Sequence, residues 1–167
     1  MKTADVIIVG SGASGLFNAL FLPKDYKVIV ITKKEVEESD SFLAQGGISA
    51  LKNPEDYDSY FEDTMKAGHY ENDKGAVEKM IKESPQIIQD LKDFGVRFDL
   101  KDGEIEFTRE GGHSTFRILH HEDLTGKEIT SHLYEEAKKR DNITIMENCT
   151  MIDIIEKDGE CKGIVYK

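Results

Sequence analysis

Three glycines near the start of the chain have the spacing of a phosphate-binding turn. Gly10, Gly12 and Gly15 form the pattern G-x-G-x-x-G inside the stretch "DVIIVGSGASGLFNALFL". The apolar run 6–9 before them predicts a buried strand, and Leu16, Ala19 and Leu20 after them have helical spacing. Glycines let the backbone approach a pyrophosphate, and the N-terminus of the following helix directs free N–H groups at it. This context predicts a dinucleotide-binding turn.

A second candidate segment is "DSFLAQGGISA", residues 40–50. Gly46 and Gly47 would let the backbone lie close to a flat ring, with consecutive N–H groups facing its electron-rich edge. Gln45 offers both a donor and an acceptor, which suits an isoalloxazine better than a nicotinamide amide. The apolar residues of this segment argue against a plain surface loop.

The position that usually contacts the ribose leaves the cofactor open. An Asp or Glu is expected there about 20 residues after the glycines, but this chain has Thr32, Lys33 and Lys34, and its first acid is Glu35. The two lysines could receive the 2′-phosphate of NADP. Alternatively, Thr32 and Lys33 could contact an adenosine ribose without any phosphate.

The elements that would position these residues alternate between strand and helix. Residues 26–32 and the segment "ITIMENC" are short and β-branched, as buried parallel strands are. The order predicts an α/β fold with a doubly wound parallel sheet, whose second and third strands lie to one side of the first. Further expected elements are helices over 57–65, 73–94 (divided by Pro85) and 127–140, and antiparallel hairpins turning at Asp102-Gly103 and Asp158-Gly159.

The predicted sheet is incomplete. The first strand is apolar on both faces, as a central strand is, yet the chain supplies neighbours mainly on one side. At 167 residues a single domain is expected. We therefore expect residues 1–167 to be the N-terminal part of a dinucleotide-binding domain, with the remainder absent.

Composition excludes some classes of function. Asp and Glu number 33 against 22 Lys and Arg, and the net charge of −11 argues against a nucleic-acid partner. No window approaches the roughly 18 apolar residues of a membrane span, and the chain runs directly into a strand without a signal peptide. Cys149 and Cys161 are expected to be small buried hydrophobes rather than a disulfide, which fits a cytoplasmic location.

Together with R-E-G-G-H-S at 109–114 and D-x-T-G at 123–126, these motifs resemble the flavoprotein family of succinate dehydrogenase, fumarate reductase and L-aspartate oxidase. The resemblance covers essentially the whole chain. It implies a Rossmann-like FAD-binding domain, with the diphosphate on Ser11–Ser14, the adenosine near Lys33 and the flavin within Asp40–Gly47. The implied cofactor-binding residues are Gly10, Ser11, Gly12, Ala13, Ser14, Gly15, Thr32, Lys33, Asp40, Ser41, Phe42, Leu43, Ala44, Gln45, Gly46 and Gly47.

Two positions distinguish the members of this family. Asp40 stands where the covalent flavoproteins have a histidine, so FAD is expected to be non-covalent. Glu110 stands where the succinate and fumarate enzymes have an apolar residue and the aspartate-oxidising enzymes have Glu. A carboxylate there can pair with the substrate ammonium, whereas with succinate it would be desolvated and unpaired. Glu110 is therefore the candidate catalytic residue.

The resemblance implies flavin-dependent oxidation of L-aspartate to iminoaspartate, the first step of NAD biosynthesis, with oxygen or fumarate as electron acceptor. It also implies a functional link to quinolinate synthase. The alternatives are a fumarate reductase or succinate dehydrogenase type of flavoprotein, and a truncated FAD-binding module without turnover. An NADP-dependent dehydrogenase is suggested only by Lys33 and Lys34. The family's main catalytic arginine and capping domain lie downstream of this length, so we expect the 167 residues alone to be inactive.

The remaining candidate residues give weaker signals. His120 and His121 could suggest a metal, but no further ligand spacing supports one, and none is expected. His113 could contact flavin or be an ordinary loop histidine. Arg109 and Arg117 could bind a carboxylate or be solvated surface cations.

Overall fold

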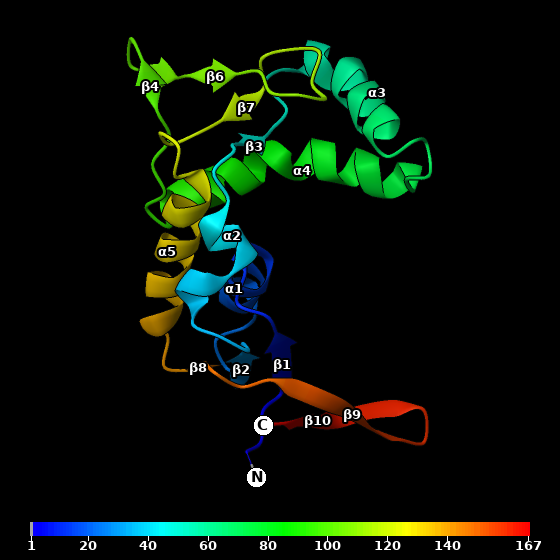
Figure 1. The fold of residues 1–167 in the computed structure, drawn as a ribbon, viewed down its shortest axis with the longest axis vertical. Helices are drawn as coiled ribbons and strands as arrows, with labels where there is room; N and C mark the ends of the chain where they lie inside the picture. Colours follow the sequence, from blue (N-terminus) through cyan, green and yellow to red (C-terminus); the bar gives the residue numbers. More distant parts are fainter. Residues whose placement is uncertain (1) are drawn as a thin grey trace. The chain divides into compact units, whose positions relative to one another are not determined.

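The computed structural model describes residues 2–167, which divide into two compact units (Figure 1). The first unit comprises the chain up to Ala44 together with Gly126–Lys167, and the second comprises Gln45–Thr125. The sequence shows no obvious interdomain linker, so the division into two units is visible only in three dimensions. The assignment of residues 1–167 to a single domain stays a prediction.

The first unit contains the predicted parallel sheet. Its strands are β1 (Val6–Val9), β2 (Val28–Ile31) and β8 (Ile143–Met146), in the order β1-β2-β8, and both pairs are parallel. All four residues of β2 are buried, as expected of its continuous β-branched run. The α/β fold class and the placement of both later strands on one side of the first are confirmed.

Helix α1 (Ala13–Phe21) and, after its first residue, helix α5 (Thr125–Lys138) lie in the same unit as the parallel sheet. Ala19 of α1 packs with Val28 and Val30 of β2, and all three are almost fully buried. The helix predicted over 127–140 is present as α5, in which Leu133 and Ala137 are buried one helical turn apart. The turn between β1 and α1 is thus held between a sheet and a packed helix.

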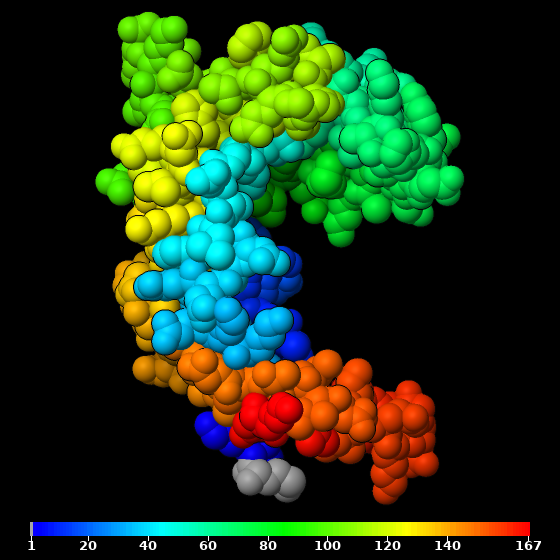
Figure 2. All heavy atoms as spheres, in the orientation of Figure 1, coloured from blue at the N-terminus to red at the C-terminus, as the bar shows by residue number. Residues whose placement is uncertain are grey.

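A long hairpin ends the first unit. Strands β9 (Met151–Lys157) and β10 (Glu160–Tyr166) are antiparallel and turn at Asp158-Gly159, as predicted. Figures 1 and 2 show the hairpin extending from the parallel sheet, and side chains such as Ile152 and Ile154 are more than half exposed. The expectation that both cysteines are buried is wrong, because Cys161 lies on this uncovered hairpin and is exposed, while Cys149 is half-buried.

The second unit pairs short strands with two long helices. Strands β3 (Ile48–Ser49), β6 (Phe107–Thr108) and β7 (Ile118–Leu119) form an antiparallel sheet in the order β3-β7-β6. Strands β4 (Leu100–Lys101) and β5 (Glu104–Ile105) form the hairpin predicted at Asp102-Gly103. Helix α3 (Tyr57–Ala67), preceded by the short helix η2 (Pro54–Asp56), packs on α4 (Lys74–Asp93). Their shared core is Tyr60, Met65, Val77 and Ile81.

Helix α4 corrects one expectation. Pro85 was expected to divide this region, but α4 is continuous through it. A proline removes the N–H that would bond to the carbonyl four residues earlier, here that of Ile81. The hydroxyl of Ser84 donates to this same carbonyl at 2.7 Å and so replaces the missing donor. Gly95, with φ of 92°, follows the end of the helix, where this backbone angle favours glycine.

Candidate functional site

One pocket of the first unit gathers three of the predicted cofactor segments. It opens where β1 and β2 end, at the carboxyl edge of the parallel sheet, which is where open α/β sheets bind ligands. The short helices η1 (Val36–Glu38) and α2 (Asp40–Leu43) follow β2 in the chain, and residues of both helices line the pocket. The lining residues are Gly10, Ser11, Gly12, Thr32, Lys33, Lys34, Glu35, Glu38, Ser39, Asp40 and Ser41.

The glycine turn of this pocket has the features of a diphosphate site. Gly12 is the N-cap residue of α1, and no side chain caps the N–H groups of the first turn. Gly10 has φ of 111°, which favours glycine. A Cβ atom on Gly15 would clash with the carbonyl oxygen of Gly10, so the helix packs against the turn more closely than any other residue allows.

A buried hydroxyl in this turn lacks a partner. Ser11 is 2% exposed, and its Oγ has no hydrogen-bond partner among residues 2–167. Burying a hydroxyl without a hydrogen bond is costly, so such groups usually face a ligand or an ordered water. A phosphate oxygen beside the free N–H groups of α1 would satisfy it, so the turn fits a diphosphate.

The two lysines after β2 differ, because Lys34 forms an ion pair with an acid of the same pocket. Lys34 Nζ lies 2.9 Å from Glu38 Oε1, and this hydrogen bond raises the pKa of Lys34. Glu38 thereby offsets one of the two positive charges that a 2′-phosphate would need. Lys33 and Thr32 line the pocket beside it. This arrangement favours an unphosphorylated adenosine ribose over NADP.

Residues 40–43 form a helix that sequence reasoning missed. Ser39 caps α2, its Oγ accepting from the N–H of Phe42 at 3.3 Å. The N–H of Gly126 donates to the carbonyl of Ala44 at 3.1 Å, and a Cβ on Gly126 would clash with that oxygen. The glycine of the D-x-T-G motif therefore allows α5 to begin directly against the end of α2.

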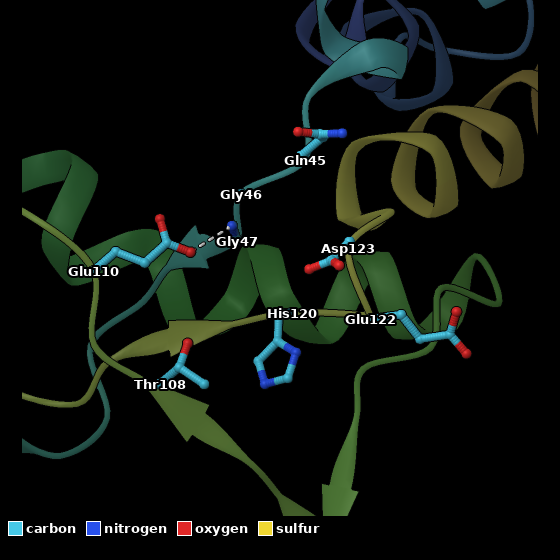
Figure 3. Close-up of a pocket in the computed structure, with 8 residues that line it drawn as sticks. All are labelled: Gln45, Gly46, Gly47, Thr108, Glu110, His120, Glu122 and Asp123. Carbon is cyan, nitrogen blue, oxygen red and sulfur yellow. Dashed lines mark hydrogen bonds between the residues drawn. The ribbon is translucent and has the colours of Figure 1, made fainter.

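A pocket of the second unit contains the remaining candidate residues (Figure 3). The N–H of Gly47 donates to Glu110 Oε1 at 3.1 Å. A Cβ on Gly46 would lie 3.3 Å from Glu110 Oε2, so the carboxylate lies directly against this glycine pair. The lining residues are Gln45, Gly46, Gly47, Thr108, Glu110, His120, Glu122 and Asp123. Two segments more than 60 residues apart thus meet at one carboxylate.

The histidine pair at 120–121 is held by one acid. His120 Nδ1 lies 3.1 Å from Asp99 Oδ2, and His121 Nδ1 lies 3.2 Å from Asp99 Oδ1. Asp99 Oδ2 also accepts from the N–H of Glu122 at 2.8 Å. Among residues 2–167, no group of three His, Cys, Asp or Glu side chains is arranged to hold a metal ion.

Arg117 is not a surface cation, which corrects that expectation, and the carboxylates that it binds belong to the protein itself. Its side chain is fully buried. It donates to both carboxylate oxygens of Asp56, at 2.8 and 2.7 Å, and to Asp63 Oδ2 at 2.6 Å. The guanidinium also donates to Ser59 Oγ at 2.6 Å and lies 4.8 Å from the ring centre of Tyr60. A buried arginine thus joins two acids of η2 and α3.

The charge pair shifts the acidity of both carboxyls. The hydrogen bond from Arg117 lowers the pKa of Asp56 from its ordinary value of 3.8 to about 2. For Asp63, burial alone would raise the pKa, but hydrogen bonds from the Ser114 N–H and from Arg117 outweigh it and lower the pKa. Both groups are therefore charged at neutral pH.

This shift predicts a specific acid sensitivity. Because Asp56 has a lower pKa in the folded state, it stabilises the fold above pH 4, and this contribution is lost as the pH falls towards 2. The contribution amounts to about 2 kcal/mol. In urea unfolding of the chain, the difference in unfolding free energy between wild type and Asp56→Asn should shrink by about this amount between pH 5 and pH 2.5. A difference that is constant over this range would contradict the assignment.

His113 lies beside the buried arginine rather than in either pocket. Its Nδ1 is 3.1 Å from Arg117 Nη1, and its ring contacts that of Tyr60 edge-on. Arginine can only donate, so His113 Nδ1 is the acceptor in this contact.

The parallel sheet, the glycine turn and the pocket at the edge of that sheet are features of a dinucleotide-binding domain. The sequence matches the FAD binding domain family over residues 5–167, and the chain belongs to that family. FAD is accordingly the cofactor. The residues of the Ser11 turn fit that cofactor, because a buried hydroxyl and the free N–H groups of helix α1 can bind a phosphate there.

Similar proteins narrow the class further. The chain is 42% identical over 165 residues to the L-aspartate oxidase of Clostridium perfringens, covering 99% of this chain and 38% of that protein. It is 46% identical over 160 residues to that of Clostridium acetobutylicum, covering 95% and 37%. Among solved structures, Escherichia coli quinol fumarate reductase matches with a TM-score of 0.91 at 26% identity, covering 98% of this chain and 29% of that one. The chain thus spans less than two fifths of the length of these relatives.

The residue at position 40 predicts how FAD is held. A carboxylate cannot form the histidyl bond that the resemblance associates with this position, so FAD should be released when the protein is precipitated with acid. The measurement is the flavin absorbance of the supernatant and of the washed pellet. Asp40→Asn should release FAD equally well, and flavin that stays with the wild-type pellet would show that another residue binds it covalently.

Proposed function

We propose that this chain is the FAD-binding part of an enzyme that oxidises L-aspartate to iminoaspartate, the first step of NAD biosynthesis. The similarity to L-aspartate oxidases over nearly all of the chain supports this activity. Because the chain spans only part of those proteins, the activity is proposed for the complete enzyme. The observation that carries the proposal is the Glu110 carboxylate lying against Gly47, in the segment expected to hold the flavin.

The residues of this chain have distinct tasks in that reaction. Ser11, Gly12 and the first turn of α1 bind the diphosphate, and Thr32 and Lys33 contact the adenosine side. FAD, when bound at these residues, would supply an acceptor for the hydride of aspartate. Glu110 binds the ammonium of the substrate and orients it through a charge-assisted hydrogen bond. Fixing the substrate in one orientation is a large part of what such a site contributes.

Glu110 also separates this proposal from its main alternative. The solved relatives include fumarate reductases, which makes a succinate or fumarate enzyme the second candidate. A substrate without an ammonium would leave the Glu110 carboxylate desolvated and unpaired, which costs several kcal/mol. The carboxylate in this pocket therefore favours aspartate. Either oxygen or fumarate would then reoxidise the flavin.

A reduction experiment tests the proposal. The full-length FAD-loaded enzyme is mixed with L-aspartate or with succinate under exclusion of oxygen, and the flavin absorbance is followed. Aspartate should bleach the flavin bands and succinate should not. Reduction by succinate but not by aspartate would replace the proposal with the succinate alternative. The 167-residue chain alone should give no turnover with either.

The location of the enzyme in the cell and its partners stay predictions. No helix among residues 2–167 is long and apolar enough to cross a membrane. The cytoplasmic location and the functional link to quinolinate synthase rest on the sequence and on the proposed reaction. The negative net charge makes a nucleic-acid partner improbable on electrostatic grounds.

A further inference from the structure

The segment that carries Glu110 has little support of its own. Residues 109–112, between β6 and β7, are all exposed, and Gly112 has φ of 87°. The two strands that flank this loop pair through only two residues each. Such a segment loses substantial conformational entropy when it is fixed in one geometry, so contacts elsewhere must hold it.

The far end of the loop is attached to helix α3. Asp63 Oδ2 accepts from the N–H of Ser114 at 2.7 Å and from its hydroxyl at 2.8 Å. The same oxygen accepts from Arg117 at 2.6 Å. The hydroxyl of Thr115 donates to Asp56 Oδ1 at 2.7 Å. Three consecutive loop residues are therefore fixed, because His113 also contacts Arg117.

The same helix holds the other wall of the pocket. The hydroxyl of Tyr60 donates to Ser49 Oγ at 2.6 Å, and Ser49 lies in β3, two residues after Gly47. Helix α3 thus contacts the strand that follows the glycine pair and the loop that carries Glu110. Glu110 and Gly47 are themselves joined by a hydrogen bond.

We propose that Asp63 is a positioning residue for Glu110: by anchoring Ser114 and Arg117 it holds loop 109–116 so that the Glu110 carboxylate faces the pocket. Asp63 does not line that pocket, so it acts through the loop. The lowered pKa of Asp63 is consistent with a carboxylate that stays charged throughout the neutral range. The consequence for catalysis rests on the proposed function, whereas the anchoring of the loop does not.

The informative substitution is Asp63→Asn. An asparagine oxygen can still accept from Ser114, but it no longer neutralises Arg117, so the anchor is weakened with little change in shape. Asp58→Asn is the matched control, because Asp58 is an exposed acid on the same helix. Both variants should keep the wild-type ratio of FAD to protein, since neither residue lies at the Ser11 turn.

The first measurement is hydrogen exchange of the full-length holoenzyme, read by mass spectrometry over residues 109–116. Asp63→Asn should exchange at least several-fold faster in this segment, and Asp58→Asn should match wild type. If Asp63→Asn leaves the exchange of this segment unchanged, the proposal is overturned, regardless of which substrate the enzyme oxidises. This measurement remains decisive even if the holoenzyme fails to oxidise aspartate, a result that would remove the proposed function alone.

The second measurement is a double-mutant cycle on the kcat/KM for aspartate. Asp63→Asn should lower it about tenfold, and adding this change to Glu110→Gln should lower it little further, because residues that act through one contact are not additive. Independent, multiplying losses would show that Asp63 does not act through Glu110 and would overturn the proposal. Asp63→Glu, which restores the charge, should recover part of the activity.

Discussion

Replacing Arg117 with methionine should destabilise the chain by about 3–5 kcal/mol, because it leaves Asp56 and Asp63 as buried or half-buried charges without a partner. The arginine is fully buried and makes four hydrogen bonds to the two acids and Ser59. A loss of this size is a large part of the 5–15 kcal/mol typical of a folded domain. The free energy of urea unfolding, followed by circular dichroism at pH 7 without FAD, measures it.

Two further variants separate the charge from the packing. Arg109→Met removes an exposed arginine of the same unit and should change the free energy of unfolding by less than about 0.5 kcal/mol. The triple variant Arg117→Met, Asp56→Asn, Asp63→Asn removes all three charges and should recover part of the loss. If the triple variant is as unstable as Arg117→Met alone, packing rather than unpaired charge explains the effect.

The parallel sheet could be predicted because its signals are local. The β-branched runs at 6–9, 28–31 and 143–146 each lie within a single strand, and the glycine turn follows the first of them directly. Hairpin turns at Asp102-Gly103 and Asp158-Gly159 are equally local, since each pair adopts the positive φ angles that Asp-Gly favours. For these strands and hairpin turns, one short segment carried each signal, and the predictions were confirmed.

Predictions failed where the partner that decides the structure is distant in the sequence, or where an unusual hydrogen-bond donor replaces the standard one. Arg117 pairs with acids 54 and 61 residues away, so no local pattern distinguishes it from a surface arginine. The one available signal was the seven-residue spacing of Asp56 and Asp63, which places both acids on one side of a helix. At Pro85 the usual rule failed because the Ser84 hydroxyl supplies the missing donor. Helix α2 has only four residues, too few to show a helical period.

The candidate site divides in the same way. The turn at Gly10–Gly15 could be derived from physical reasoning about strands, glycines and helix dipoles. Glu110 could be chosen only through the family resemblance, because an acid in a glycine-rich loop is ordinarily a surface residue. The structure adds its contact with Gly47. The structure also shows Asp63 bonded to Ser114 in the loop that carries Glu110, a contact that no pattern in the sequence indicates.

Glu110→Gln should lower the kcat/KM of the full-length enzyme for aspartate by about ten- to a hundred-fold, the loss of a charge-assisted contact of about 1.5–3 kcal/mol. The substitution is selective, because a glutamine oxygen can still accept from the Gly47 N–H as Glu110 does. The loop should therefore keep its place while the attraction for the substrate ammonium is lost. Steady-state rates with aspartate measure this effect.

The reverse reaction provides the internal control, because fumarate has no ammonium for Glu110 to bind. Reduction of fumarate by the pre-reduced enzyme should fall much less than aspartate oxidation, and it should improve where the bare carboxylate had opposed an apolar carbon. Measuring both rates on one preparation cancels differences in folding and FAD content. Glu104→Gln, an exposed acid of the same unit that does not line this pocket, should leave both rates near wild type. If Glu110→Gln lowers both activities equally, Glu110 supports the fold or the flavin, and aspartate loses its chemical advantage over succinate as the substrate.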